Sequence, residues 1–179
     1  MPPFIRPAAP FAVIVMGVSG CGKSTLGALL AEALRCPFLE GDDFHSREAI
    51  AKMRGGEPLG DEDRWPWIER IGHATAGAVA EHGAAVTACS ALRRCYRDRL
   101  RATIGRPVHL ILLENSRERL IERLLARAGH FMPVGLLDSQ LATLERPLAD
   151  EDALTLRTEE PASSLRDLIL TRMDLQRSR

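Results

Sequence analysis

The chain has 179 residues, of which 45% are apolar and 27% charged, and its formal net charge is zero. This length and balance fit one globular domain with a real core, and we see no second domain or repeat. A net charge of zero provides no basic excess for nucleic acid or for an acidic membrane surface, so neither is expected as a partner.

The N-terminal segment MPPFIRPAAP (1–10) lacks the apolar core of a signal peptide, and we interpret it as a loose leader. The longest apolar runs are too short to span a bilayer. The cysteine spacings match no common zinc pattern, which predicts reduced thiols and a cytoplasmic location. The four cysteines are Cys21, Cys36, Cys89 and Cys95.

Apolar runs alternate with helically spaced segments along the chain, and a turn-rich stretch, GGEPLGDED, separates the second and third of those helices. Strands that alternate with helices predict a three-layer α/β fold, in which a five-stranded parallel sheet is covered by helices on both faces. The predicted strands are 11–18, 36–42, 84–91, 108–115 and 153–158, and the predicted helices are 24–35, 46–54, 65–82, a basic helix ending near 102, 116–129 and 163–176.

The first predicted strand runs into GVSGCGKS (17–24), which matches the P-loop pattern G-x-x-x-x-G-K-[ST]. Its glycines let successive N–H groups face one centre, and the following helix directs its positive end there. The pattern predicts ATP and Mg²⁺ as cofactors, with Lys23 pairing the β- and γ-phosphates and Ser24 binding the metal. The alternative is a glycine turn between a strand and a helix. The predicted ATP-binding residues of this segment are Gly17, Ser19, Gly20, Cys21, Gly22, Lys23, Ser24 and Thr25.

Other P-loop classes fit the chain poorly. The Asp-x-x-Gly and Asn-Lys-x-Asp motifs of GTPase switches are absent from the sequence. The third predicted strand ends without a Walker B aspartate, and the fourth offers only Glu114. These absences favour a small kinase whose functional carboxylates lie away from the ends of these two strands.

Glu40 and Asp42 end the second predicted strand, beside the P-loop in such a fold. Because strand side chains alternate, we expect both carboxylates on one side. Glu40 would hold Mg²⁺ through water, and Asp42 would accept the proton of an attacking hydroxyl or orient it. The alternative is a polar loop cap.

Three further segments resemble gluconate kinases. The first, GDDFHSREAIAKMRGGEPLGDEDRWPW (41–67), is similar to that family's acceptor segment, G-D-x-x-H, K-M and G-x-P-L-x-D-x-D-R-x-P-W. The segments CSALRRCYRDRLR (89–101) and RAGHFMPVGLLDSQLATLERP (127–147) continue the resemblance in order. The chain departs from the family at Cys21, at Arg93 where lysine is usual, and at the extra Arg146.

The resemblance implies a shikimate-kinase-like arrangement, a homodimer, and gluconate bound opposite ATP in an acceptor-binding segment, 41–82. The residue types in this segment suit gluconate, because its carboxylate needs cationic partners and its hydroxyls need partners such as Asp and His. Each residue also has a structural alternative; for example, Arg64 pairs instead with Asp61 or Asp63. The expected substrate-binding residues are Asp42, His45, Arg47, Lys52, Arg64, Arg97 and His130.

The helix predicted over 116–129 has Arg119, Arg123 and Arg127 on one face. Kinases of this shape close a lid over ATP, and we expect a helical lid region over about 117–147. Arg123 and Arg127 would bind ATP, and Arg127 would act catalytically by neutralising the transferring phosphoryl group. The alternative is a solvated basic face. The adenine pocket is expected near Arg127 and Glu160-Pro161.

The sequence therefore predicts one kinase domain over 1–179 that phosphorylates the 6-hydroxyl of gluconate. A related small-metabolite kinase, with shikimate or a nucleoside monophosphate as acceptor, is the first alternative. A non-catalytic nucleotide sensor is the second.

Overall fold

The computed structural model describes residues 9–126 and 134–177. Five strands form one sheet in the order β2-β3-β1-β4-β5, and every pairing is parallel. The predicted five-stranded parallel sheet is therefore confirmed. The strands are β1 (Phe11–Met16), β2 (Phe38–Glu40), β3 (Ala84–Ala88), β4 (Val108–Glu114) and β5 (Ala153–Arg157).

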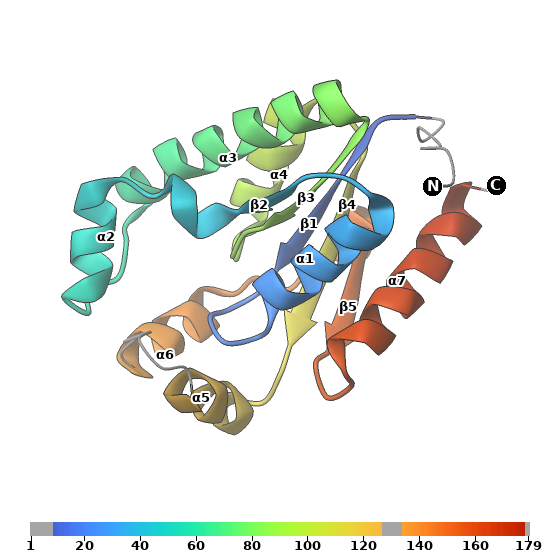
Figure 1. Ribbon diagram of the computed structural model, residues 1–179. Helices are drawn as coiled ribbons and strands as arrows, with labels where there is room; N and C mark the ends of the chain where they lie inside the picture. The colour runs from blue at the N-terminus through green and yellow to red at the C-terminus, as the bar shows by residue number, and fades with distance from the viewer. Residues whose placement is uncertain (1–8, 127–133, 178–179) are drawn as a thin grey trace.

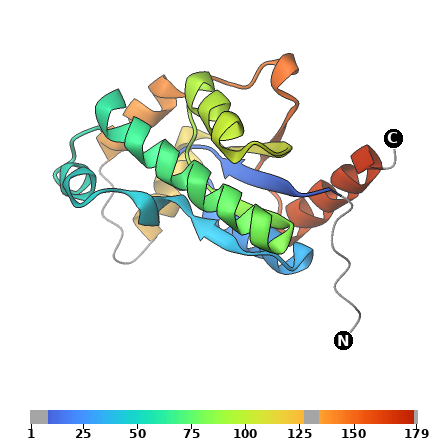
Figure 2. The same ribbon diagram turned by 90° about the horizontal axis from the view of Figure 1, so that it is seen from above.

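Helices cover both faces of this sheet, as expected (Figure 1). On one face lie α1 (Lys23–Leu34) and α7 (Ala162–Arg177), which contact each other. On the other lie α3 (Asp61–His82) and α4 (Arg94–Ile104), and Figure 2 shows α3 running across the molecule. β1 is apolar at every position because these helices bury both of its faces.

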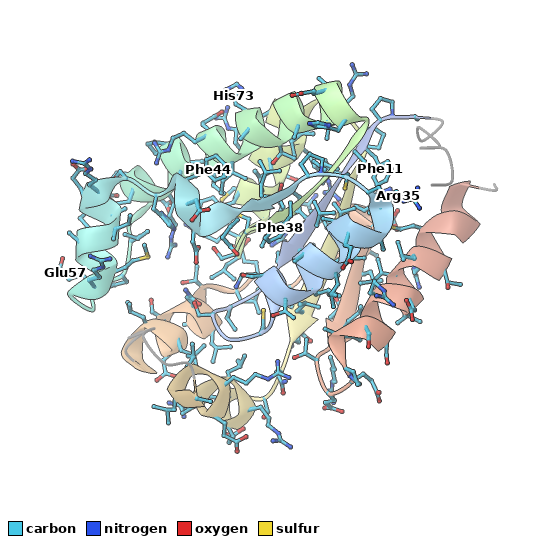
Figure 3. All side chains as sticks on the ribbon, viewed as in Figure 1. Phe11, Arg35, Phe38, Phe44, Glu57 and His73 are labelled. Atoms are coloured by element: carbon cyan, nitrogen blue, oxygen red, sulfur yellow. The ribbon has the colours of Figure 1, made fainter. Side chains whose placement is uncertain are left out.

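Two apolar cores result, one on each side of the sheet. Val13 and Val15 of β1 pack into the core below α1 and α7, whereas Ile14 and Met16 pack into the core below α3 and α4. At Gly27, the first core leaves no room for a side chain, because a Cβ there would lie 2.5 Å from the Phe38 ring, which Figure 3 labels.

The short turn η2 (Ala149–Glu151) directly precedes β5, at the amino ends of the strands. The other elements gather beyond the carboxyl ends of the strands (Figure 1). They are the short turn η1 (Gly41–Phe44) and the helices α2 (Arg47–Arg54), α5 (Arg117–Ala126) and α6 (Val134–Thr143). In open α/β sheets ligands bind at this edge. None of the described helices combines the length and the apolar composition that a bilayer crossing demands.

Two boundaries near the site and one helix differ from the sequence prediction. β2 ends at Glu40, because the chain turns into η1 at Gly41. α3 begins at Asp61 rather than at 65, because three acidic residues favour the first turn of a helix and Asp63 accepts a hydrogen bond from Gly60 N at 3.2 Å. α6 was not predicted, since its sequence VGLLDSQLAT carries no capping residue or charge pattern.

Candidate active site

The P-loop joins β1 to α1 with the backbone that its glycines require. Gly17, Gly20 and Gly22 have φ values of 138°, 82° and 99°. A Cβ at Gly17 would lie 2.5 Å from the carbonyl oxygen of Leu113, so no other residue fits there. α1 begins at Lys23, whose Nζ donates to the carbonyl of Val18 at 2.9 Å.

A cavity of about 320 Å³ opens on one side of this loop, and we call it the P-loop cavity. Arg123 of α5 reaches it, donating to Thr158 Oγ1 at 3.0 Å, to the Thr158 carbonyl at 2.7 Å and to the Cys21 carbonyl at 3.4 Å. The cavity is lined by Gly20, Cys21, Gly22, Thr25, Leu26, Leu113, Arg123, Ala126, Thr158, Glu160, Ala162 and Leu165. Four of the eight predicted P-loop residues, Arg123 and the loop after β5 therefore surround one space.

A second, smaller cavity of about 80 Å³ opens on the other side of the loop, and we call it the acceptor cavity. Its walls come from the P-loop, η1, α2 and the turn after it, the start of α3, the turn after β3, and α6. They are Ser19, Lys23, Asp42, His45, Met53, Glu57, Pro58, Leu59, Arg64, Trp67, Ser90, Leu92, Leu136, Ser139 and Gln140. Figure 3 labels Glu57, just beyond α2. The P-loop thus forms a wall of both cavities.

Charged groups from three elements converge near the carboxyl end of β3. Burial raises the pKa of the Cys89 thiol to about 12, with Asp42 and Glu40 raising it further and Lys23 opposing them. The expectation that Glu40 and Asp42 share one side of a strand was wrong, because Asp42 lies in η1. Asp42 lines the acceptor cavity, whereas Glu40 and Ser24 line neither cavity.

His45 has an almost fully buried side chain, 5% exposed, whose ring stacks on Trp67 at a centroid distance of 4.4 Å. Its Nε2 lies 3.9 Å from Asp42 Oδ1, and Nδ1 is buried without a hydrogen-bond partner among the described residues. Trp67 is fixed by its Nε1–H, which donates to the Gly41 carbonyl at 2.7 Å. Burial lowers the pKa of His45, although Asp42 opposes the shift, so the ring is neutral at neutral pH.

The lowered pKa of His45 predicts a loss of stability in acid. The unfolded chain binds a proton at His45 more readily than the folded chain, so protonation below pH 6.5 favours unfolding. The free energy of unfolding in urea should therefore fall more between about pH 7.5 and 5.5 for the wild type than for His45→Gln. Equal losses in the two proteins would show that His45 titrates normally.

Arg64, in the first turns of α3, lines the acceptor cavity without an ion-pair partner among the described residues. Both nearby carboxylates are engaged elsewhere. Asp61 accepts hydrogen bonds from Tyr96 and Arg93, and Asp63 pairs with Lys52 at 2.8 Å. Among the described residues Arg64 therefore pairs with neither carboxylate. Its Nη1 donates to the Tyr96 hydroxyl at 3.5 Å, and its guanidinium lies 5.9 Å from the Tyr96 ring centroid.

Three expected substrate-binding residues do not line the acceptor cavity. Arg47 lies on the exposed start of α2, and Lys52 points to Asp63. The expectation for Arg97 was wrong, because its side chain is 1% exposed and its Nε pairs with Glu151 at 2.5 Å. Arg97 is thus a structural residue below the cavity.

Two predicted residues, Arg127 and His130, lie outside the described residues, as does most of the leader over 1–10. The structure adds wall residues to which sequence reasoning assigned no role, notably Ser90, Ser139 and Gln140. Their signal was present, because all three stand in the segments that carry the family resemblance.

Comparisons with known proteins agree with this geometry. A family model described as an AAA domain matches residues 13–147. The thermosensitive gluconokinase of Escherichia coli is 47% identical over 77% of this chain and 73% of its own length. The gluconokinase of Gluconobacter oxydans is 44% identical over 89% of this chain and 90% of its own. The crystal structure of a gluconokinase from Sinorhizobium meliloti matches with a TM-score of 0.79 and 39% identity, covering 93% of this chain and 97% of that one.

The family model spans the P-loop and every segment that forms the acceptor cavity. The two curated relatives and the solved structure are 39–47% identical and cover 77–93% of this chain. The chain belongs to the gluconokinase family.

Proposed function

We propose that this chain transfers the γ-phosphate of ATP to the 6-hydroxyl of D-gluconate, giving 6-phosphogluconate and ADP. One observation carries the proposal: the P-loop is a wall shared by two cavities. Gly20 to Gly22 face the larger cavity, while Ser19 and Lys23 face the smaller one. A triphosphate bound along this loop would present its terminal phosphate to a molecule in the acceptor cavity.

The walls of the acceptor cavity suit a polyhydroxy acid. The cationic Arg64 can bind a carboxylate in a bidentate manner, and it has no competing carboxylate partner among the described residues. Asp42 and His45 offer an acceptor and a neutral imidazole to hydroxyls. A nucleotide acceptor would need several phosphate-binding arginines, and Arg64 is the sole arginine of this wall within the described residues.

In the proposed reaction the 6-hydroxyl attacks the γ-phosphorus in line with the bond to the leaving oxygen of ADP. A new O–P bond forms while the bond to ADP breaks, and the hydroxyl proton passes to Asp42, which also orients the hydroxyl. Lys23 holds the charge of the transferring group, after exchanging its bond to the Val18 carbonyl for phosphate oxygens.

The residues present fit a Mg²⁺ ion that is held mainly by nucleotide and water. Within the described residues, no group of three or more His, Cys, Asp or Glu side chains is arranged to cage a metal. Mg²⁺ in kinases is bound through few protein ligands and the substrate phosphates, so Ser24 with water-mediated Glu40 would suffice. The ion would neutralise charge on the β- and γ-phosphates.

We propose the lid over about 117–147 and its arginines as the means of excluding water. α5 and α6 flank the P-loop cavity and the acceptor cavity, and Arg123 already reaches the P-loop. Arg123 and Arg127 would contact ATP, and His130 the acceptor. A homodimer and a cytoplasmic location remain further proposals, of which sedimentation would test the first.

The role proposed for Arg64 predicts a selective loss of gluconate affinity. Arg64→Met should raise the KM for gluconate at least about tenfold, because a charged hydrogen bond to the carboxylate disappears. The KM for ATP should stay within about twofold, since the residue faces only the acceptor cavity. A matched control is Arg106→Met, which removes an exposed arginine that lines neither cavity. Equal effects of the two variants would contradict the proposed role of Arg64.

ADP release with Mg-ATP tests the function itself, using gluconate, shikimate, glycerate, AMP and no acceptor in parallel. Strong turnover with gluconate alone is the expected result. Turnover with another acceptor would keep the P-loop kinase and reject gluconate. ATP binding without turnover on any acceptor would favour a sensor.

A further inference from the structure

One side chain of α6 contacts the P-loop directly. Gln140 Oε1 accepts a hydrogen bond from the backbone N–H of Ser19 at 2.7 Å, across 121 residues of sequence. This distance is at the short end of the range for an N–H···O bond. Leu136 and Leu137 are buried and hold α6 in place, and Gln140 follows one turn later on the same side. Figure 1 shows α6 next to the loop between β1 and α1.

The Ser19 contact fixes the orientation of the Gln140 carboxamide. A backbone N–H can only donate, so the carboxamide oxygen faces Ser19 and the NH₂ group must turn away from it. Because Gln140 lines the acceptor cavity, this orientation leaves two neutral N–H donors at the cavity wall.

The position of Ser19 shows which end of the cavity these donors serve. Ser19 faces the acceptor cavity, whereas the next three P-loop residues face the P-loop cavity. Gln140 therefore stands where the terminal phosphate would meet the acceptor. The cationic Arg64 enters the same cavity from α3, a different element, and it serves a carboxylate better than a neutral amide does.

We infer that Gln140 binds the acceptor at its phosphate-receiving end, with its oxygen anchored on Ser19 and its NH₂ group donating to the hydroxyl next to the reacting one. The inference rests on the proposed function, for which that group is the 5-hydroxyl of gluconate. This bond would hold the chain end of the substrate so that the 6-hydroxyl faces the phosphate.

The test is a double-change cycle, in which kcat/KM is measured for the wild type and a Gln140 variant, each with gluconate and with a substrate analogue. Gln140→Met keeps the length of the side chain but removes the donor, and 5-deoxygluconate removes the oxygen that it would serve. We expect each change alone to lower kcat/KM for the acceptor about tenfold, and both together to lower it little further than one alone. Gln140→Glu, which keeps an oxygen for Ser19 but lacks the donor, should lose at least as much.

Two controls separate this role from a structural one. Gly135→Ala changes an exposed position of α6 where a Cβ meets no atom within 4 Å, so it should leave kcat/KM unchanged. Thermal midpoint and ATP binding measured with a fluorescent nucleotide should also be unchanged in Gln140→Met. Additive losses in the cycle would overturn the inference, and so would tighter ATP binding with unaltered acceptor KM, which would make Gln140 a placeholder for a phosphate oxygen.

Failure of the proposed function has a different signature. It would appear in the wild type, as turnover with an acceptor other than gluconate. The inference would then stand only if Gln140→Met raised the KM of that acceptor and not the KM of ATP.

Discussion

Asp42→Asn is expected to lower kcat for gluconate phosphorylation by about a thousandfold, within the range of a lost general base. Asparagine keeps the shape of the side chain and can still accept a hydrogen bond, but it cannot take the proton of the attacking hydroxyl. Because Asp42 lies on the exposed turn η1, the change should leave folding intact. The KM for ATP should change little, since Asp42 does not line the P-loop cavity.

Asp43→Asn is the matched control, since Asp43 is the next residue of the same turn, is also exposed and lines neither cavity. Single-turnover measurements should locate the loss of Asp42→Asn in the chemical step rather than in product release. If both variants lost activity equally, η1 would serve only as scaffold. A loss below about tenfold would assign Asp42 to orientation of the hydroxyl instead of proton transfer.

The central part of the fold could be predicted from sequence because it depends on local patterns. The β1 run is apolar at every position since both faces of the sheet are covered, and the glycines of the P-loop mark the positive φ values that the turn needs. The same reasoning failed one residue past β2. Alternation holds only while the strand continues, and nothing in the letters E-G-D shows that the chain turns at Gly41.

The partners of charged side chains were less predictable, because they are set by tertiary packing. Arg64 was ambiguous until the structure paired Asp61 with Arg93 and Asp63 with Lys52, which leaves Arg64 to the acceptor cavity. Gln140 lies in the segment 127–147, but the sequence assigned it no role because its contact with the P-loop spans 121 residues. Local spacing cannot encode such contacts.

Arg97 illustrates the same limit most clearly. As part of a basic helix beside the acceptor segment it suggested a substrate-binding cation, yet its partner, Glu151, lies 54 residues further along the chain. Both side chains are 1% exposed. A guanidinium buried so completely needs a carboxylate, and the fold supplies one from η2.

Arg97→Met is therefore expected to destabilise the fold by about 3–5 kcal/mol, because it leaves the Glu151 carboxylate buried without its partner. In a chain of this size the thermal midpoint should fall by roughly 10 °C. The double variant Arg97→Met/Glu151→Leu should be less destabilised than the sum of the two single variants, which a double-mutant cycle in urea measures. Arg94→Met is the control, since it removes an exposed ion pair with Asp150 from the same helix and should change little.

Loss of Arg97 should also disturb a turn that lines the acceptor cavity. Its Nη1 donates to the carbonyls of Ala91 and Leu92 at 3.3 and 3.2 Å, and Ala91 has the unfavourable φ of 41°. This turn presents Ser90 and Leu92 to the cavity, so releasing it should raise the KM for gluconate more than the KM for ATP in the folded fraction. Equal KM changes, or full additivity in the double-mutant cycle, would contradict a role for Arg97 in holding this turn. A selective rise in the gluconate KM would show that the buried ion pair shapes the acceptor cavity without touching the substrate.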